Sequence, residues 1–141
     1  MSYSNSGLIG NCFIDGIPAD LETFKTKVRE AGIDRAYGRP PRTDPVFLRL
    51  IMNHPIPDHW DGNLRKDASA GKIPYTGQSE ILSMIEPVKQ ALQGVFFHDE
   101  RQIVRYEIRN QYGDIRDKEP CLYIMVAPLR LWKRLTSQEQ P

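Results

Sequence analysis

Apolar residues along the chain gather in separate blocks, and each block has the spacing of a helix or a strand. The clearest helical period places apolar side chains at the i, i+3, i+4, i+7 positions of one face, namely at Ile81, Met84, Ile85, Val88, Ala91 and Leu92. Ser83 and Glu86 have the spacing of a capping box, which puts Pro87 near the start of the helix, and Gly94 ends it.

Three further runs have the length and composition of strands, at residues 46–54, 101–112 and 121–129. In the second run, apolar and charged residues alternate, which predicts one buried face and one charged face. The predicted buried side carries Val104, Tyr106 and Ile108, and the charged side carries Arg105, Glu107 and Arg109. A short first strand in "NCFIDGIP" precedes a helix that Asp20 caps and Gly32 ends.

The order of these elements predicts an α+β domain, with helices packed on one face of a small mixed β-sheet. A length of 141 residues fits a single domain over 1–141. Residues 1–9 are expected to be loose, and residues 129–141 form a basic C-terminal tail. A long loop after residue 54 is interrupted by a short helix around Gly62–Ala70.

Composition narrows the class of protein only a little. The net charge of +1 argues against a protein that coats DNA nonspecifically but allows a local basic face. No apolar run approaches the roughly 20 residues of a membrane span, and the start of the chain lacks the pattern of a signal peptide. We therefore expect a cytoplasmic protein without membrane contact. Cys12 and Cys121 are expected to be buried free thiols, with a bridge between them as the alternative.

An acidic cluster is the first candidate site. Glu80 and Glu86 lie at the helix entry, and His98, Asp99 and Glu100 lie in the turn before the strand at 101–112. Carboxylates from two such segments could share Mg²⁺, which activates water in phosphodiester cleavage. The alternative is that these residues have only structural roles. Glu86 would complete a capping box, and the helix dipole would stabilise the negative charge of Glu80 near the N-terminus. Asp99 and Glu100 would then simply face solvent in the turn.

Two groups of basic residues could contact nucleic-acid phosphates. The first is a stripe on the strand at 101–112, with one helical lysine nearby: Arg101, Arg105, Arg109 and Lys89. The second lies in the long loop and comprises Arg65, Lys66 and Lys72. The alternative for both groups is an ordinary solvated surface.

The segments "IPDHW", "LRKDASAGK", "ALQGVFFHDERQIV" and "NQYG", in this order, resemble the RusA family of Holliday-junction resolvases. In that family an acidic D-x-D-N motif opens the helix, and a D-D-x-Q turn enters the next strand. The resemblance covers roughly residues 55–112 and is most specific in "ALQGVFFHDERQIV". It implies a homodimer that binds branched DNA, and a Mg²⁺ site.

The active-site motif is degenerate in this chain. Glu80 stands at the first aspartate of D-x-D-N, Leu82 at the second, and Glu86 where the family has a catalytic lysine. Asp99 and Glu100 replace the two aspartates of the turn. The resemblance thus implies Glu80 and Glu100 as the remaining Mg²⁺ ligands, with Glu86 or Asp99 as possible additions.

Two interpretations follow from this motif. The favoured one is a dimeric module, with impaired or absent nuclease activity, that binds branched DNA or a protein partner. The alternative is an active Mg²⁺-dependent endodeoxyribonuclease that resolves Holliday junctions in DNA recombination and repair. For a protein partner, the tail segment "LRLWKRL" is the expected contact.

Overall fold

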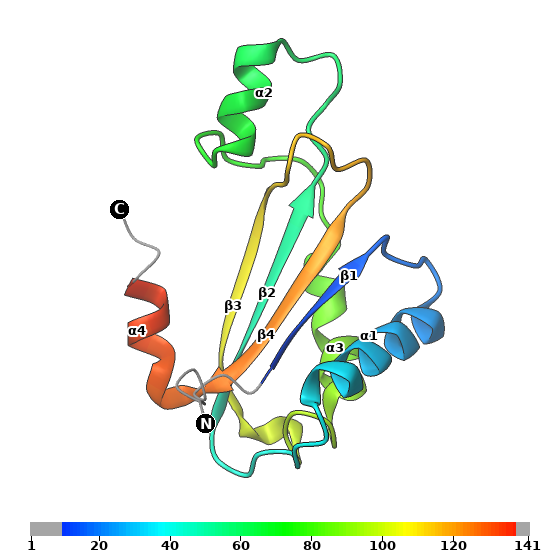
Figure 1. Cartoon of the computed structure of the whole chain (residues 1–141), viewed down its shortest axis with the longest axis vertical. Coiled ribbons are helices and arrows are strands. Elements are labelled where there is room, and N and C mark those ends of the chain that lie inside the picture. Colours follow the sequence, from blue (N-terminus) through cyan, green and yellow to red (C-terminus); the bar gives the residue numbers. More distant parts are fainter. Residues whose placement is uncertain (1–9, 138–141) are drawn as a thin grey trace.

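The computed structural model describes residues 10–137, and the predicted loose segment 1–9 and the end of the tail, 138–141, lie outside the described residues. Four strands form one mixed sheet in the order β1-β4-β2-β3 (Figure 1). They are β1 (Gly10–Asp15), β2 (Val46–His54), β3 (Ile103–Tyr112) and β4 (Cys121–Pro128). β2 and β3 are parallel, while β4 runs antiparallel to β1 and β2. The predicted α+β class is confirmed.

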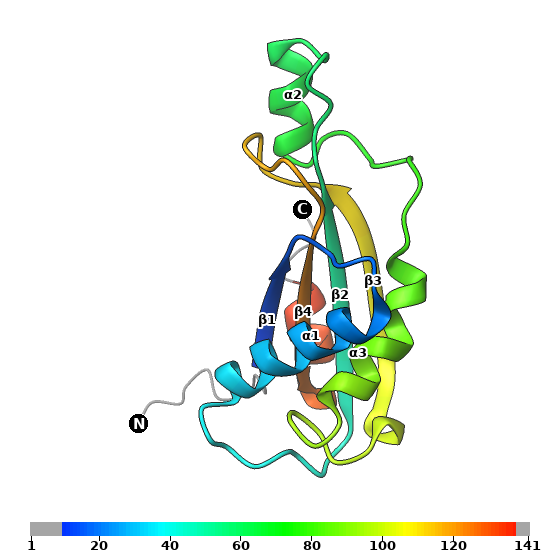
Figure 2. The same cartoon turned by 90° about the vertical axis from the view of Figure 1, so that its right-hand side faces the viewer.

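Two helices, α1 (Leu21–Ala36) and α3 (Ile85–Leu92), pack on one face of the sheet (Figure 2). A 3-10 turn, η2 (Ile81–Met84), leads into α3. The main core between helices and sheet includes Val28, Leu48, Leu50, Val88, Leu92 and Ile124. A third helix, α2 (Gly62–Ser69), projects beyond the end of the sheet, close to where the short helix of the loop was predicted.

Helix α1 begins as predicted, because the Asp20 carboxylate accepts a hydrogen bond from the Thr23 amide at 2.8 Å. The predicted end at Gly32 is wrong, since α1 continues to Ala36 and Gly32 is buried within it. A Cβ at Gly32 would lie 2.6 Å from Leu92 Cδ2. The glycine therefore allows α1 and α3 to approach closely and does not end the helix.

The entry into α3 also differs from the prediction. The Ser83 hydroxyl donates to the Glu80 carbonyl at 2.6 Å, and Glu86 pairs with Lys89, so the predicted capping box is wrong. The 3-10 turn η2 comes first, which places Pro87 in the first turn of α3, where its missing amide costs least. The end is as predicted, because Gly94 has a φ of +84° just after the helix.

The start of the C-terminal tail is part of the fold. A 3-10 turn, η4 (Leu129–Leu131), and α4 (Trp132–Ser137) fold onto the face of the sheet opposite α1 and α3. Leu131 is 9% exposed, and the Trp132 ring packs edge-on against Phe47 with centroids 5.0 Å apart. The predicted basic tail thus begins as a packed segment, because Leu131 and Trp132 cover one end of this face of the sheet.

Strand β3 alternates as predicted only in part. Glu107 lies on the face opposite α3 and Ile108 packs toward the core, but Val104 is 51% and Tyr106 is 41% exposed. The predicted buried face is therefore wrong at these two residues. The reason is that β3 is an edge strand with a register irregularity near its start.

Both cysteines are free and buried, as predicted. Cys12 belongs to the main core, whereas Cys121 pairs with Asp15 three residues further along β1, so the alternative of a bridge is wrong. Burial raises the pKa of the Cys12 thiol to about 11. Within residues 10–137, no helix has the length and apolar character needed to cross a membrane.

Candidate functional site

The two carboxylates proposed as Mg²⁺ ligands lie at opposite ends of β3. Glu80 follows Ser79, whose hydroxyl donates to Asn110 Oδ1 near the end of the strand at 2.6 Å. Glu100 lies in η3 (Glu100–Gln102), directly before the strand begins. A strand rises about 3.3 Å per residue, so the path from Ile103 to Asn110 spans roughly 23 Å. Glu80 and Glu100 of one chain cannot bind the same ion.

Glu86 and Glu100 lie close to each other, and the ammonium group of a lysine lies between their carboxylates. Lys89 Nζ lies 2.9 Å from Glu86 Oε2 and 3.5 Å from Glu100 Oε1, and its side chain is only 13% exposed. The hydrogen bond that Lys89 donates to Glu86, and then its contact with Tyr106, raise the pKa of Lys89. An ammonium group thus already occupies the position between the carboxylates that a cation would take.

Asp99 is engaged as well. It caps η3 by accepting from the Arg101 amide at 2.8 Å, and it forms an ion pair with the Arg101 guanidinium at 2.8 Å. The hydrogen bonds from Arg101 lower the pKa of Asp99 to about 2. Gln102 completes a capping box, and its side-chain oxygen also accepts from the His98 amide at 2.8 Å.

These contacts do not fit a Mg²⁺ site. Within the described part of the chain, no three His, Cys, Asp or Glu side chains lie close enough together to hold a metal ion. Leu82, at the position of the family's second aspartate, is 71% exposed and offers no ligand atom. We therefore derive no chemical step through a metal.

The predicted basic stripe on β3 is divided among different partners. Arg109 pairs with Glu107, whose other oxygen accepts from Arg49 Nε at 2.6 Å. Arg101 is paired with Asp99. Arg105 is different, because its guanidinium carbon lies 5.4 Å from the centre of the Trp132 ring. Lys89 belongs to α3 and lies on the face of the sheet that the helices cover, whereas Arg105 lies on the opposite face. The structure therefore does not place the two residues together.

Arg105 joins the exposed basic residues of the C-terminal segment. We call these four residues the basic surface: Arg105, Arg130, Lys133 and Arg134. The sequence contains no acidic residue from Cys121 to Ser137. Arg130 lies near Asp44, however, whose pKa is lowered first by the hydrogen bond from Arg42 and also by the charge of Arg130. The Trp132 ring thus places one residue of the predicted strand stripe, Arg105, next to the basic C-terminal segment.

The basic residues of the long loop lie elsewhere. Arg65 and Lys66 belong to α2, at the other end of the sheet from α4, and Lys72 follows that helix (Figure 1). Arg65 lies 3.7 Å from Asp58 and donates to the Ile115 carbonyl. Lys66 and Lys72 are exposed. The structure therefore does not combine the two predicted basic groups into one surface.

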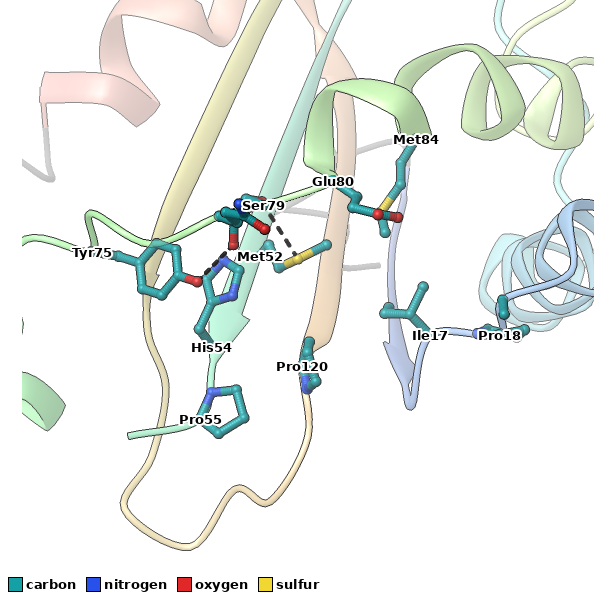
Figure 3. A pocket seen from close by; sticks show the side chains of 12 residues that line it. Ile17, Pro18, Met52, His54, Pro55, Tyr75, Ser79, Glu80, Met84 and Pro120 are labelled. Carbon is teal, nitrogen blue, oxygen red and sulfur yellow. Dashed lines mark hydrogen bonds between the residues drawn. The ribbon is translucent and has the colours of Figure 1, made fainter. Parts of the chain in front are cut away.

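An open pocket of about 800 Å³ lies where the parallel strands end (Figure 3). It is lined by Ile17, Pro18, Ala19, Met52, His54, Pro55, Tyr75, Gln78, Ser79, Glu80, Met84 and Pro120. Glu80 is the one predicted site residue in this pocket, which combines segments from distant parts of the sequence. The ends of parallel strands are a frequent place for ligands, but sequence reasoning did not find the pocket.

Hydrogen bonds hold the polar side chains of the pocket in place. Asn110 Oδ1 lies 2.9 Å from His54 Nε2 and also accepts from the Ser79 hydroxyl. The His54 ring, 5% exposed, stacks on Tyr75 with centroids 3.7 Å apart. Ser79 and His54 therefore share an acceptor and are not bonded to each other, so the pocket lacks the hydroxyl-to-imidazole contact of a nucleophilic hydrolase.

Comparison with models of protein families finds no match for this chain, and comparison with curated proteins finds none either.

Proposed function

We propose that this protein is a RusA-like module that binds branched DNA through the basic surface and lacks the nuclease chemistry of that family. One observation carries the binding part of the proposal: Arg105 of β3 lies over the ring of Trp132 in α4. This contact joins cations from two segments into one surface. Such a surface attracts the phosphate backbone and binds more weakly as salt rises.

The lack of nuclease chemistry rests on the placement of the carboxylates. Glu80 and Glu100 lie at opposite ends of β3, and Lys89 stands between Glu86 and Glu100. Metal-dependent cleavage needs ligands held to about half an ångström. These residues provide no such arrangement within a chain, which favours binding without cleavage over an active Mg²⁺-dependent resolvase.

The alternative of a protein partner on the tail has less support. Two apolar residues of the segment, Leu131 and Trp132, already pack in one cluster with Phe47 of the same chain. The residues that remain outward are Arg130, Lys133 and Arg134, all exposed. Exposed cations suit a phosphate backbone better than the core of a protein interface.

The proposal includes the homodimer that the RusA resemblance implies. A two-fold dimer would present two basic surfaces to a junction that has two-fold symmetry itself. The long edge strand β3 is one support, because Val104 and Tyr106 are exposed there and an unpaired edge is open to pairing with another chain. Sedimentation of the pure protein tests this part without DNA.

The test of function uses a labelled four-way junction with and without Mg²⁺, read on native and denaturing gels. We expect a shifted band without cuts. The variant Arg130→Gln/Lys133→Gln should weaken binding and reduce the slope of log affinity against log salt by about 2. Lys66→Gln/Lys72→Gln is the matched control at the other end of the sheet and should leave the slope nearly unchanged. Cuts that require Mg²⁺, or an equal effect of the two variants, would overturn the proposal.

A further inference from the structure

Among residues 10–137, helical cover on the face of the sheet opposite α1 and α3, which we call the open face, lies only at one end. Leu131 and Trp132 of the C-terminal segment pack at the end where β2 begins, against Phe47. Figure 1 shows no helix over the rest of this face. The uncovered part lies directly beside the basic surface, because Arg105 contacts Trp132.

Two aromatic residues lie on the open face: Phe13 is exposed, and Tyr123 packs at the margin of the apolar cluster under the C-terminal segment. Cys12 and Ile14 point into the main core, so Phe13 between them points to the open face, and it is 48% exposed. Phe13 is paired with Tyr123 across β1 and β4, and Tyr123 is half-buried. Within residues 10–137, the Phe13 ring makes no contact with another ring. No ring of the described residues therefore covers the surface of Phe13.

The residues paired across the sheet with Phe13 and Tyr123 end in a cationic residue on β3. Tyr123 is paired with Ile51 of β2, and Ile51 with Arg109 of β3. Neighbouring strands lie about 4.8 Å apart, so Arg109 starts roughly 10 Å from Tyr123. An aromatic ring, an apolar side chain and a guanidinium thus follow one another across the sheet.

The charges on this face favour a polyanion over a second copy of the chain as its occupant. The open face carries Arg49, Arg105 and Arg109 against the carboxylates of Asp15 and Glu107, and the cations of α4 adjoin it. Two such faces repel each other, whereas a polyanion is attracted. An exposed aromatic ring on a face that also carries cations is the combination by which proteins bind unpaired nucleotides.

We infer that the open face binds unpaired nucleotides, with bases stacked on Phe13 and Tyr123 and phosphates held by Arg109 and the basic surface. This inference rests on the proposed nucleic-acid binding and names the part of a branched substrate that the sheet takes. A base inside a duplex shows only its edges, so a flat ring on a sheet can stack only on a base that is unpaired.

The experiment measures fluorescence anisotropy with a labelled oligothymidine of about 15 nucleotides, an oligouridine of the same length and a matched duplex. We expect tighter binding of the oligothymidine than of the duplex. Phe13→Leu keeps the apolar bulk but removes the flat ring, and should weaken oligothymidine binding about five- to hundredfold. Phe13→Trp should restore it. Tyr37→Ala, at an aromatic residue 72% exposed at the end of α1, is the matched control and should change nothing.

The nucleic-acid probes separate the possible ligands. Equal affinity for oligothymidine and oligouridine assigns the face to unpaired nucleotides in general, and tighter oligouridine binding assigns it to RNA through the 2′-hydroxyl. Duplex binding as tight as oligothymidine binding, with no effect of Phe13→Leu, overturns the inference. If junction binding still depends on Arg130 and Lys133 in that case, the proposed function stands alone. If the protein binds none of the probes, both the proposed function and this inference are overturned.

Discussion

The Ser79 hydroxyl donates a hydrogen bond to Asn110 Oδ1 at 2.6 Å, which fixes the entry of η2 and α3 against the far end of β3. The chain then descends through α3 and turns into β3 at the strand's other end. A helix that returns through a short turn runs antiparallel to the strand that follows. Glu80 at the start of the helix is thereby kept away from Glu100 at the start of the strand.

Divalent metal should therefore leave the stability of the protein unchanged. We expect the melting temperature in millimolar Mg²⁺ or Mn²⁺ to agree within about 1 °C with the value in EDTA, because a ligand stabilises only the fold that binds it. Differential scanning calorimetry measures this directly. A clear rise in melting temperature that both Glu80→Gln and Glu100→Gln abolish would contradict the expectation, and would show that the two carboxylates meet across separate chains.

The turn before β3 gives a prediction about pH. Hydrogen bonds from the Arg101 side chain and then from its amide lower the pKa of Asp99 to about 2. The folded pKa lies below the unfolded value of about 3.9, so the contribution to stability is present above pH 4 and is lost as the pH falls through about 2. NMR titration of the Asp99 carboxyl should show this value. In Arg101→Gln the pKa should rise but stay below normal, since the amide at position 101 still donates.

The strands were predictable because each one is a local apolar run. Residues 46–54 were predicted and observed as a strand, and the run at 121–129 differs from β4 by one residue. Helix ends were less predictable, because Gly32 looks like a terminator in sequence but serves the close packing of α1 on α3. Propensity is local, whereas that contact joins residues far apart in the chain.

The candidate site was predicted less well, because its geometry depends on the topology of the fold. The acidic residues are near in sequence, but the direction of α3 relative to β3 decides which of them meet, and periodicity does not reveal it. The contact between Arg105 and Trp132 and the pocket around His54 depend likewise on which strands become neighbours. The strand order β1-β4-β2-β3 could not be read from the hydrophobic pattern.

Removal of the Trp132 ring should destabilise the fold. Trp132 is half-buried and covers Phe47, so we expect Trp132→Ala to lower the free energy of unfolding by about 2 kcal/mol, less than for a fully buried aromatic residue. Urea denaturation followed by circular dichroism measures the change. Trp132→Phe should recover most of it. Trp60→Ala is a suitable comparison, because Trp60 is half-buried beside Tyr112 at the other end of the sheet. An unchanged stability of Trp132→Ala would mean that α4 is a detachable tail.

The ion pair between Arg49 and Glu107 lies largely out of solvent, with side chains 8% and 17% exposed. Glu107→Gln removes a carboxylate that Arg49 and Arg109 share, and we expect it to lower the free energy of unfolding by about 2–3 kcal/mol, since a shielded charge loses its counter-charge. Asp114→Asn, in an exposed pair with Arg116, is the matched control and should cost less than about 1 kcal/mol.

A double-mutant cycle separates this pair from effects on the rest of the sheet. Arg49→Met removes the buried cation, so Arg49→Met/Glu107→Gln should be less destabilised than the sum of the single variants, with a coupling energy of about 1–3 kcal/mol. Urea denaturation of the four proteins gives the cycle. Strict additivity would mean that the contact at 2.6 Å contributes nothing beyond the packing of the two side chains. The expected coupling would show instead that Glu107 offsets the positive charge of Arg49 within the sheet.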